Sequence, residues 1–418
     1  IAGDRASLQL FVPKGQRKAA ALSLASVTHG YRGLFESAEP TQKSGSCNVD
    51  AACSAGNSWH DQMASVGQYT FSNGGSSFVC TGTLMANTGN TTTPYFLTAN
   101  HCMSTQTAAS TVVVYWNYQS ANCRAPGSAS SGTSLSRTIA SHNQSGSTLR
   151  ATNAASDFTL LQLSTNVPVG ASPFFSGWSR STTAPTSARG IHHPAGHEKR
   201  FSTDNNALTI ASYLGAAGSG SSHWRVGNWE GGTTEGGSSG SGLWDQNRRL
   251  VGQLHGGYAA CGNTGADWYG RLSQSWTGGG SNATRLSNWL DPGNTGATTK
   301  DGYRLGGFFQ TTTDVTVSDN ATVESSLTVS GRTGNAPTTL RVNARIMHTY
   351  VGDMKVDLVA PNGSVFTLHN RTGAGADNLY QTYQVNASAS VANGTWRLRV
   401  NDNATGDTGF IDVFSLQF

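Results

Sequence analysis

Three residues whose side chains can together activate a nucleophile occur in this sequence in the order His101, Asp157 and Ser239. A serine hydroxyl attacks a carbonyl carbon when a histidine accepts its proton, and a carboxylate bound to that histidine holds the ring in the required orientation. The three residues therefore predict covalent catalysis. In this scheme His101 is the general base and then the general acid, Asp157 orients it, and Ser239 carries the intermediate.

Glycines surround Ser239 in the segment 236–242, which has the sequence GGSSGSG. Residues without a Cβ allow backbone N–H groups to point together at a developing oxyanion. We assign this role to the N–H groups of Gly237 and Ser239. A run of glycine and serine is also typical of a flexible surface loop, so this segment alone does not identify Ser239 as the nucleophile.

The neighbours of His101 and Asp157 strengthen the pattern. His101 follows the apolar run 95–99, and Asp157 directly precedes the apolar run 158–161. A carboxylate beside an apolar strand needs a hydrogen-bond partner, because burying it unpaired is costly. Either residue alone could be structural. With Ser239 they follow the chain order of chymotrypsin-type enzymes, whereas subtilisins and α/β-hydrolases use other orders.

The elements that must position these residues are short β-strands. The chain has 51 glycines and only 12% charged residues, and its β-branched and aromatic runs alternate with turns of Gly, Ser, Thr and Asn. This pattern favours an all-β chain of barrels or sandwiches over helical bundles. Predicted strands lie at 78–84, 111–116 and 158–163.

Charge and hydropathy exclude several functional classes. The net charge of +4 is modest and the basic residues are scattered, which argues against a nucleic-acid partner. No run approaches the roughly 18 apolar residues of a membrane-spanning helix. The chain opens at Ile1 near a strand-like stretch, residues 8–13, with no visible signal peptide, so we expect a precursor already cut at its start.

Six cysteines form an even set without a CxxC pair, which argues against a zinc site. In a chain of this composition they predict three disulfides and an oxidising, extracellular compartment. Spacing alone does not select among the pairings.

Composition also divides the chain into parts. Residues 1–43 have no cysteine, and from about residue 311 Thr, Val, Asn and Asp dominate, again without cysteine. A helix is predicted over 283–290, stopped by an Asp-Pro-Gly sequence. The predicted divisions are a propeptide remnant at 1–43, a catalytic domain at 44–300, a linker at 301–310 and a β-sandwich at 311–418.

Residues 44–303 resemble bacterial lysyl endopeptidases, which are serine proteases with a chymotrypsin-like double β-barrel. The matching stretches, in order, are 44–48 (SGSCN), 95–99 (YFLTA), 113–118 (VVYWNY), 156–161 (SDFTLL), 190–194 (GIHHP) and 252–257 (GQLHGG). Two departures are Asn100, where the family often has a second histidine, and Gly242, where a proline is usual. We expect little effect from the first and a slightly looser loop from the second.

The resemblance implies a secreted, zymogen-derived serine protease domain that cleaves after lysine. It implies the disulfides Cys47–Cys261, Cys53–Cys123 and Cys80–Cys102. Thr233 occupies the position where trypsin has its pocket aspartate, so the resemblance assigns the substrate ammonium to Asp267 instead. It also makes Trp178 and His255 an aromatic pair near the catalytic histidine. A turn position for Asp267 and core packing for the aromatic pair are the alternatives.

Lysine usage supports a preference for lysine at the cleavage site. Of the 27 basic residues only six are lysines, and residues 44–299 contain a single one, Lys199, against eleven arginines. A GC-rich genome would also favour arginine. One carboxylate does not by itself distinguish an ammonium from a guanidinium. The alternatives are therefore an endopeptidase that accepts arginine as well, and a degenerate protease that acts as a binding module. His192 and His193 are interpreted as structural loop residues.

Residues 311–418 resemble the P domain that follows subtilisin-type convertases and some bacterial proteases. The matching stretches are 346–353, 358–364, 393–398 and 407–409. Because members of that family often bind calcium, Asp353, Asp402 and Asp407 are candidate ligands, although ordinary turn aspartates would look the same. Catalysis itself is expected to need no cofactor.

Two lysines predict self-processing. Lys43 directly precedes the cysteine-bearing region, and Lys300 follows the polar segment 294–299. Exposed chain of this kind is where nicking concentrates, so we expect cuts after both, while packing of 191–201 protects Lys199. We expect a monomer that acts on protein or peptide substrates, with neither nucleic acid nor membrane as a partner.

Overall fold

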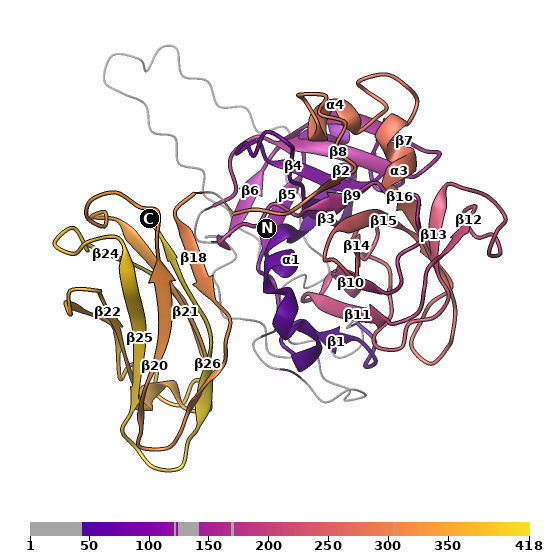
Figure 1. Ribbon diagram of the computed structural model, residues 1–418. Helices are drawn as coiled ribbons and strands as arrows, with labels where there is room; N and C mark the ends of the chain where they lie inside the picture. Colours follow the sequence, from indigo (N-terminus) through magenta and orange to yellow (C-terminus); the bar gives the residue numbers. More distant parts are fainter. Residues whose placement is uncertain (1–43, 121–122, 124–141, 169–170, 305) are drawn as a thin grey trace.

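The computed structural model describes residues 44–120, 123, 142–168, 171–304 and 306–418. Within these ranges the chain consists mainly of antiparallel β-sheet and forms two bodies that lie side by side (Figure 1). The prediction of an all-β chain is confirmed. The strand-like stretch 8–13 and Lys43 lie outside the described residues.

A seven-stranded sheet carries His101 and Asp157 at one end. Its strand order is β6-β5-β2-β3-β4-β8-β7. The strands are β2 (Val66–Asn73), β3 (Ser76–Leu84), β4 (Tyr95–Ala99), β5 (Val113–Trp116), β6 (Asn143–Ser145), β7 (Ser147–Asn153) and β8 (Phe158–Leu163). β4 and β8 pair antiparallel, with Ala99 opposite Phe158. Because His101 follows β4 and Asp157 precedes β8, this pairing brings both residues to the same end of the sheet.

A second sheet supplies the other candidate site residues. Its strand order is β1-β11-β10-β14-β15-β16-β13-β12, with β9 between β15 and β17. The strands are β1 (Val49–Asp50), β9 (Trp178–Ser179), β10 (Ala188–His192), β11 (Arg200–Asp204), β12 (Thr209–Ala211), β13 (His223–Val226), β14 (Gly242–Asp245), β15 (Leu250–Gly257), β16 (Asp267–Arg271) and β17 (Thr299–Lys300). Ser239 precedes β14, His255 lies in β15 and Asp267 begins β16.

One apolar core spans both sheets. Phe96 and Leu160 of the first sheet belong to the same buried cluster as Phe201 and Trp244 of the second. Burying a side chain of this size contributes about 1.5–3 kcal/mol relative to leaving it exposed. The two curled sheets are therefore one packed body, in agreement with the predicted double-barrel fold.

The helices are short, and none in the described residues is long and apolar enough to cross a membrane. They are η3 (Ser54–Trp59), α1 (His60–Ser65), α2 (Gln106–Ser110), η6 (Pro194–Gly196), α3 (Leu272–Thr277), α4 (Ser287–Leu290) and η7 (Val351–Asp353). The helix predicted over 283–290 is thus only half formed. Thr284 instead closes a turn with Ser281, through its N–H at 3.0 Å and its hydroxyl at 2.8 Å, and such local bonds compete with a helix.

The C-terminal body is a β-sandwich, as predicted. One sheet has the order β18-β26-β21-β24 with β19 also on β26, and the other has the order β20-β25-β22-β23. The strands are β18 (Phe308–Thr311), β19 (Val315–Val317), β20 (Thr322–Val329), β21 (Leu340–His348), β22 (Met354–Val359), β23 (Val365–Asn370), β24 (Leu379–Val385), β25 (Gly394–Asp402) and β26 (Gly409–Gln417). In β25 the buried residues alternate, Trp396, Leu398 and Val400, which is the two-residue period of a half-buried strand.

The connection between the two bodies is shorter than the predicted linker 301–310. Lys300 lies in β17 and pairs with Trp178 of β9. Tyr303 exchanges backbone hydrogen bonds with Phe175 at 2.9 and 3.0 Å, and the two rings stack with centroids 5.0 Å apart. The first body therefore extends to Tyr303, and Lys300 lies in a short paired strand between the exposed residues Thr299 and Asp301.

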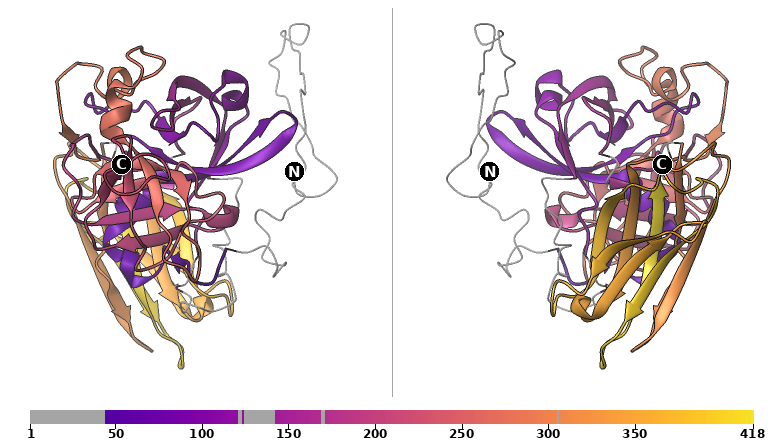
Figure 2. Two further views of the ribbon diagram at one scale, coloured as in Figure 1. Left: turned by 90° about the vertical axis from the view of Figure 1, so that its right-hand side faces the viewer. Right: turned by 90° about the vertical axis from the view of Figure 1, so that its left-hand side faces the viewer.

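The sandwich packs on the α1 side of the first body (Figures 1 and 2). Arg304 binds Asp61 of α1 at 2.7 Å, and its guanidinium lies 4.2 Å from the ring centroid of Phe308 in β18. His60 of α1 lies 3.7 Å from Asp412 of β26. None of these contacts between the two bodies involves His101, Asp157 or Ser239.

Candidate active site

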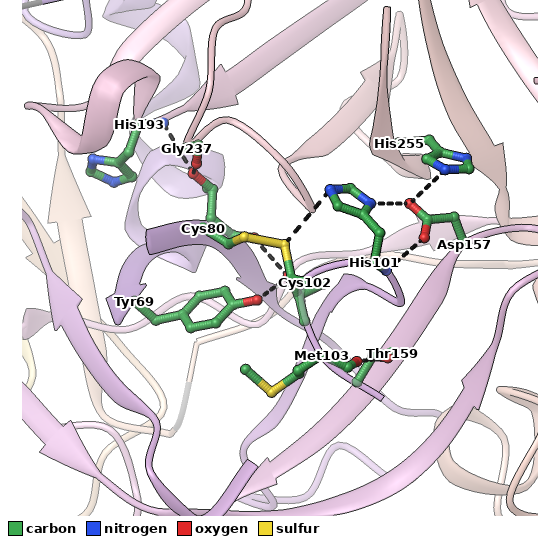
Figure 3. Close-up of a disulfide and its surroundings, with 12 residues drawn as sticks. Tyr69, Cys80, His101, Cys102, Met103, Asp157, Thr159, His193, Gly237 and His255 are labelled. Carbon is green, nitrogen blue, oxygen red and sulfur yellow. Dashed lines mark hydrogen bonds and ion pairs between the residues drawn. A yellow bond between two sulfur atoms is a disulfide. The ribbon is translucent and has the colours of Figure 1, made fainter. Parts of the chain in front are cut away.

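His101 and Asp157 form a hydrogen-bonded pair (Figure 3). Nδ1 of His101 lies 2.8 Å from Oδ2 of Asp157, and the backbone N–H of His101 donates to Oδ1 at 2.8 Å. The carboxylate side chain is 2% exposed, whereas the imidazole is 38% exposed. Nδ1–H therefore donates to the carboxylate, and Nε2 is left to accept a proton from a reacting group.

The turn that carries Asp157 is fixed by the second sheet. The residue has a left-handed backbone with φ of 54°, and its N–H donates to Ala154 O at 3.2 Å. The side-chain amide of Gln253 in β15 donates to Ser156 O at 2.7 Å. A Cβ on Gly270 of β16 would lie 1.8 Å from Ser156 O, so only glycine permits this close approach.

Ser239 lies in the loop before β14, and this loop is bonded to both sheets. Its carbonyl accepts the N–H of Thr81 in β3 at 2.9 Å, while the N–H of Gly240 donates to the backbone of β15 at 2.9 Å. Gly240 has φ of 79°, and a Cβ there would lie 2.2 Å from Oγ1 of Thr98. Among the described residues the Ser239 hydroxyl makes no hydrogen bond to His101. This contact is often loose in enzymes without substrate.

The backbone around Ser239 leaves two N–H groups available for an anion. Within the described residues neither Gly237 nor Ser239 donates its N–H to a protein acceptor. Gly237 has φ of 93°, a conformation that favours glycine. Between them, Ser238 is held by His192, whose Nδ1 lies 2.8 Å from the serine Oγ. Burial lowers the pKa of His192 to about 3, so this ring is neutral; the residue ends β10 and does not lie in a loop as we expected.

Asp267 begins β16 and is completely buried. Oδ2 accepts hydrogen bonds from the indole of Trp229 at 2.7 Å and the hydroxyl of Thr234 at 2.8 Å. Oδ1 is equally buried and completes no hydrogen bond of standard geometry. Burial raises the pKa of this carboxyl, and the bonds from Trp229, Thr234 and the backbone of Ala259 oppose the rise. A buried carboxylate with one oxygen unpaired favours a cationic partner.

His255 joins the acid–base pair from β15. Its ring stacks on that of His101 with centroids 5.4 Å apart, and its Nε2 lies 3.8 Å from Oδ2 of Asp157 (Figure 3). Tyr213 also stacks on it, with a centroid distance of 3.5 Å and an interplanar angle of 5°. Nothing in the sequence around Tyr213 indicated this contact.

The position that we expected for Trp178 is wrong. Trp178 is fully buried in the core, where it packs against Trp276 with centroids 4.6 Å apart. Its indole N–H donates to Ala86 O at 2.9 Å. The ring that stacks on His255 is therefore Tyr213. Trp178 has the structural role that we gave as the alternative.

A further histidine extends this group away from Asp157. Nε2 of His223 lies 3.0 Å from Nδ1 of His255, and Nδ1 of His223 lies 2.7 Å from the hydroxyl of Ser222. In the described part of the chain, His101, Asp157 and His255 are the only three ligand-type residues whose ligand atoms all lie within 4.8 Å of one another. The hydrogen bond and the ring stacking described above account for this closeness.

The six cysteines pair as the resemblance implies. The disulfides are Cys47–Cys261, Cys53–Cys123 and Cys80–Cys102. The third joins β3 to the residue that follows His101 (Figure 3). It therefore ties the turn that carries the histidine to the interior of the first sheet.

Chymotrypsin-like serine proteases place a histidine and its carboxylate on one curled sheet and the serine on another. The two sheets and the His101–Asp157 pair put this chain in that class. More particularly, the chain belongs to the lysyl endopeptidase family. The family described as lysyl endopeptidase, C-terminal domain, matches residues 41–270, which is more than half of the chain. The family described as proprotein convertase P-domain matches residues 337–418.

Individual relatives match only in part. A lysyl endopeptidase of Pseudomonas aeruginosa is 32% identical over 275 residues, which cover 63% of this chain and 57% of that protein. Leupeptin-inactivating enzyme 1 of Streptomyces exfoliatus is 57% identical over 112 residues, 26% of each chain. A transglutaminase-activating metalloprotease of Streptomyces mobaraensis is 44% identical over 114 residues, 27% of this chain and 15% of that protein. The chain thus spans less than two thirds of the length of these relatives.

Solved structures are similar at low sequence identity. Protease Anisep from Arthrobacter nicotinovorans is 16% identical with a TM-score of 0.36, and the match covers 54% of this chain and 93% of that one. A Glu endopeptidase is 18% identical with a TM-score of 0.33, and the match covers 54% and 91%.

Proposed function

We propose that this protein is a secreted serine endopeptidase that cleaves peptide bonds on the carboxyl side of lysine. The observation that carries the proposal is the His101–Asp157 pair. Its buried carboxylate binds Nδ1 and fixes the ring, so Nε2 is the nitrogen that would take the proton of Ser239. Membership of the lysyl endopeptidase family supports the same chemistry.

In the acylation step, Oγ of Ser239 attacks the carbonyl carbon of the substrate while its proton passes to Nε2 of His101. The electron pair of the carbonyl bond moves to oxygen, and the N–H groups of Gly237 and Ser239 stabilise that charge. The C–N bond then breaks as His101 gives its proton to the leaving amine. Water repeats the sequence on the ester and releases Ser239. Asp157 stabilises the imidazolium in both steps.

Asp267 is the proposed partner of the substrate lysine. Its Oδ1 is buried without a hydrogen bond of standard geometry, and it lies so close to Gly257 that a Cβ there would come within 2.3 Å of it, so only glycine fits beside this carboxylate. A lysine ammonium is compact and can reach a single buried oxygen, whereas a guanidinium is broad and needs more room. Acceptance of arginine beside lysine remains the alternative within the same class.

The test combines a nucleophile variant with cleavage mapping. Ser239→Ala should fold normally but lose peptidase activity and labelling by a serine-directed fluorophosphonate, because only the nucleophile is removed. Ser221→Ala, at an exposed serine, is the control and should keep both. Mapping of cuts on a denatured protein mixture should show lysine at nearly every cut. Substantial turnover by folded Ser239→Ala would refute the assignment. Frequent cuts after arginine would favour the alternative.

Secretion, maturation from a zymogen and a monomeric state are part of the same proposal. Three disulfides in the first body support an oxidising compartment. Size-exclusion chromatography with light scattering of the purified chain tests the monomer, and a mass twice that of the chain would contradict it.

We also propose that the sandwich binds calcium near Asp353. Partial desolvation, followed by the neighbouring carboxylates of Asp402 and Asp407, raises the pKa of Asp353, and such crowding of acids suits a cation. Oδ2 of Asp402 is buried and completes no hydrogen bond. In the described residues these carboxylates do not come within 4.8 Å of one another as a set of three. Calcium, but not magnesium, should raise the melting temperature above that in EDTA. Equal melting temperatures would contradict calcium binding.

A further inference from the structure

His223 is a buried titratable residue for which the mechanism above has no use. It begins β13 and is 1% exposed. It bonds on one side to Nδ1 of His255 at 3.0 Å and on the other to Ser222 at 2.7 Å. His255 in turn lies beside the carboxylate of Asp157. A line of polar contacts thus runs from the catalytic carboxylate into the interior of the second sheet.

The protons along this line are determined by its carboxylate end. A nitrogen that faces a carboxylate is stabilised when it carries a proton, so Nε2 of His255 is the protonated nitrogen of its neutral ring. Nδ1 of His255 is then bare and must accept. Nε2–H of His223 is the donor to it, which leaves Nδ1 of His223 bare to accept the hydroxyl proton of Ser222. With both rings neutral, each of the two hydrogen bonds of the line has one donor and one acceptor, and Nε2–H of His255 points toward Oδ2 of Asp157 at 3.8 Å.

The surroundings keep both rings neutral. Burial lowers the pKa of His223 to about 4, with a smaller lowering from His255 and an opposing effect of Asp157. Burial also lowers the pKa of His255, while Asp157 raises it and His101 lowers it. Tyr213 faces both rings, at 3.5 Å from His255 and 5.6 Å from His223 between centroids. Burial raises the pKa of Tyr213, so it adds no charge at neutral pH.

We propose that His223 is a positioning residue for the triad. By donating Nε2–H to Nδ1 of His255, it holds His255 in the tautomer that the carboxylate favours, with an N–H, and not a lone pair, facing Asp157. This fixed N–H stabilises the carboxylate that orients His101. The inference rests on the proposed function, because it assigns His223 a part in the same site.

Two substitutions separate the donated proton from mere packing. His223→Gln keeps a side-chain N–H near the position of Nε2, whereas His223→Leu fills similar space without a donor. His223→Leu should lower kcat about tenfold with little change in KM, and His223→Gln should stay within about threefold of the parent, since one oriented hydrogen bond is at stake. His369→Gln in the sandwich is the control for a buried histidine and should leave kcat unchanged.

The pH profile gives a readout that packing would not move. Without the donor, a second proton on Nδ1 of His255 no longer meets an opposing N–H, so the pKa of His255 rises in His223→Leu. A charged His255 beside Asp157 opposes the charge that forms on His101. The acid limb of kcat should therefore move to higher pH in His223→Leu, and it should stay in place in His223→Gln and His369→Gln.

Nitrogen NMR of the parent protein tests the tautomer directly and needs no catalysis. With ¹⁵N-labelled histidine, neutral His255 should show a protonated Nε2 and a bare Nδ1. The opposite tautomer would overturn the proposal, even if His223→Leu failed to fold. A folded His223→Leu with the parent kcat and acid limb would also overturn it, as would equal losses in the Leu and Gln variants. A parent protein without peptidase activity would sink the proposed function and leave the tautomer test intact.

Discussion

Replacing Asp267 by asparagine removes a buried charge while keeping the shape of the side chain. Trp229 and Thr234 both donate to Oδ2, so the asparagine oxygen will take that place and its NH₂ will lie where Oδ1 was. A lysine ammonium would then meet a donor in place of an acceptor. Cutting one partner of a buried charge pair costs about 2–5 kcal/mol, which corresponds to a loss of about 30- to 5,000-fold in kcat/KM.

The assay compares three peptides that differ only at the residue before the cut: lysine, arginine and norleucine. The loss should appear with lysine and be absent with uncharged norleucine. Asp245→Asn is the matched control, because Asp245 is also a buried carboxylate with a pKa raised by burial, and asparagine can keep its turn. It should leave the lysine preference unchanged.

The same substitution has an opposite effect on stability. The pKa of Asp267 is raised in the folded protein, so the folded state binds a proton more readily than the unfolded state. Stability is then lost as the pH rises from about 4, the ordinary range of an aspartate, through the folded pKa. Asp267→Asn lacks this loss. Its free energy of unfolding at pH 7 should equal or exceed that of the parent.

A loss of less than tenfold on the lysyl peptide would refute this reasoning. Another carboxylate would then receive the ammonium, and the loop offers Glu230 and Glu235. The structure gives both other partners. Oε1 of Glu235 accepts the N–H of Gly45 at 2.8 Å, and Glu230 is exposed and bonded to Asn206 at 2.7 Å. Neither has the buried, unpaired oxygen that Asp267 presents.

Three further predictions follow from the geometry. Asp157→Asn should lower kcat by roughly 10⁴-fold with little effect on KM, because the tautomer of His101 is no longer fixed. Steady-state kinetics measure the loss, and an unchanged near-UV circular dichroism spectrum shows that the variant is folded. A drop in kcat of less than tenfold would contradict the prediction. Cys80→Ser with Cys102→Ser should lower the free energy of unfolding by about 3 kcal/mol in urea titrations, and an unchanged midpoint would argue against it. Mass spectrometry during incubation should show a new N-terminus at Ser44 in the active protein and none in Ser239→Ala. The chain should stay uncut after Lys300, because this residue is paired in β17. Equal cuts in both proteins would count against self-processing.

Much of the fold could be predicted because its signals are local. The runs 95–99 and 158–163 are apolar, β-prone and bounded by turn residues, and they form β4 and β8 with those limits. The need of Asp157 for a partner followed from the cost of an unpaired carboxylate, and His101 supplies that partner. Lys199 is held by packing as expected, since it is fully buried and its ammonium donates to Met63 O.

Contacts that depend on strand register could not be predicted. His223 reaches His255 because β13 and β15 both pair with β16, which aligns residues far apart in the sequence. Tyr213 comes from the turn after β12 and has no distinctive neighbours. From the sequence, Trp178 looked as suitable as Tyr213 for stacking on His255. The sequence around a single tryptophan does not show which part of the core its ring enters. The pairing of Lys300 with β9 could not be predicted for the same reason, since a two-residue strand has no signal of its own.

The candidate site lies at the seam between two sheets that share one core, and this ties its geometry to packing. Asp157 and His101 come from the first sheet, but Gln253 and Gly270 of the second fix the turn before Asp157. Ser239 comes from the second sheet, but Thr81 of the first holds its carbonyl. Each half therefore positions the other's reactive group. A core substitution that lets the sheets slide by a few tenths of an ångström should reduce kcat before it unfolds the protein, because the hydrogen bonds that position the reactive groups cross the seam.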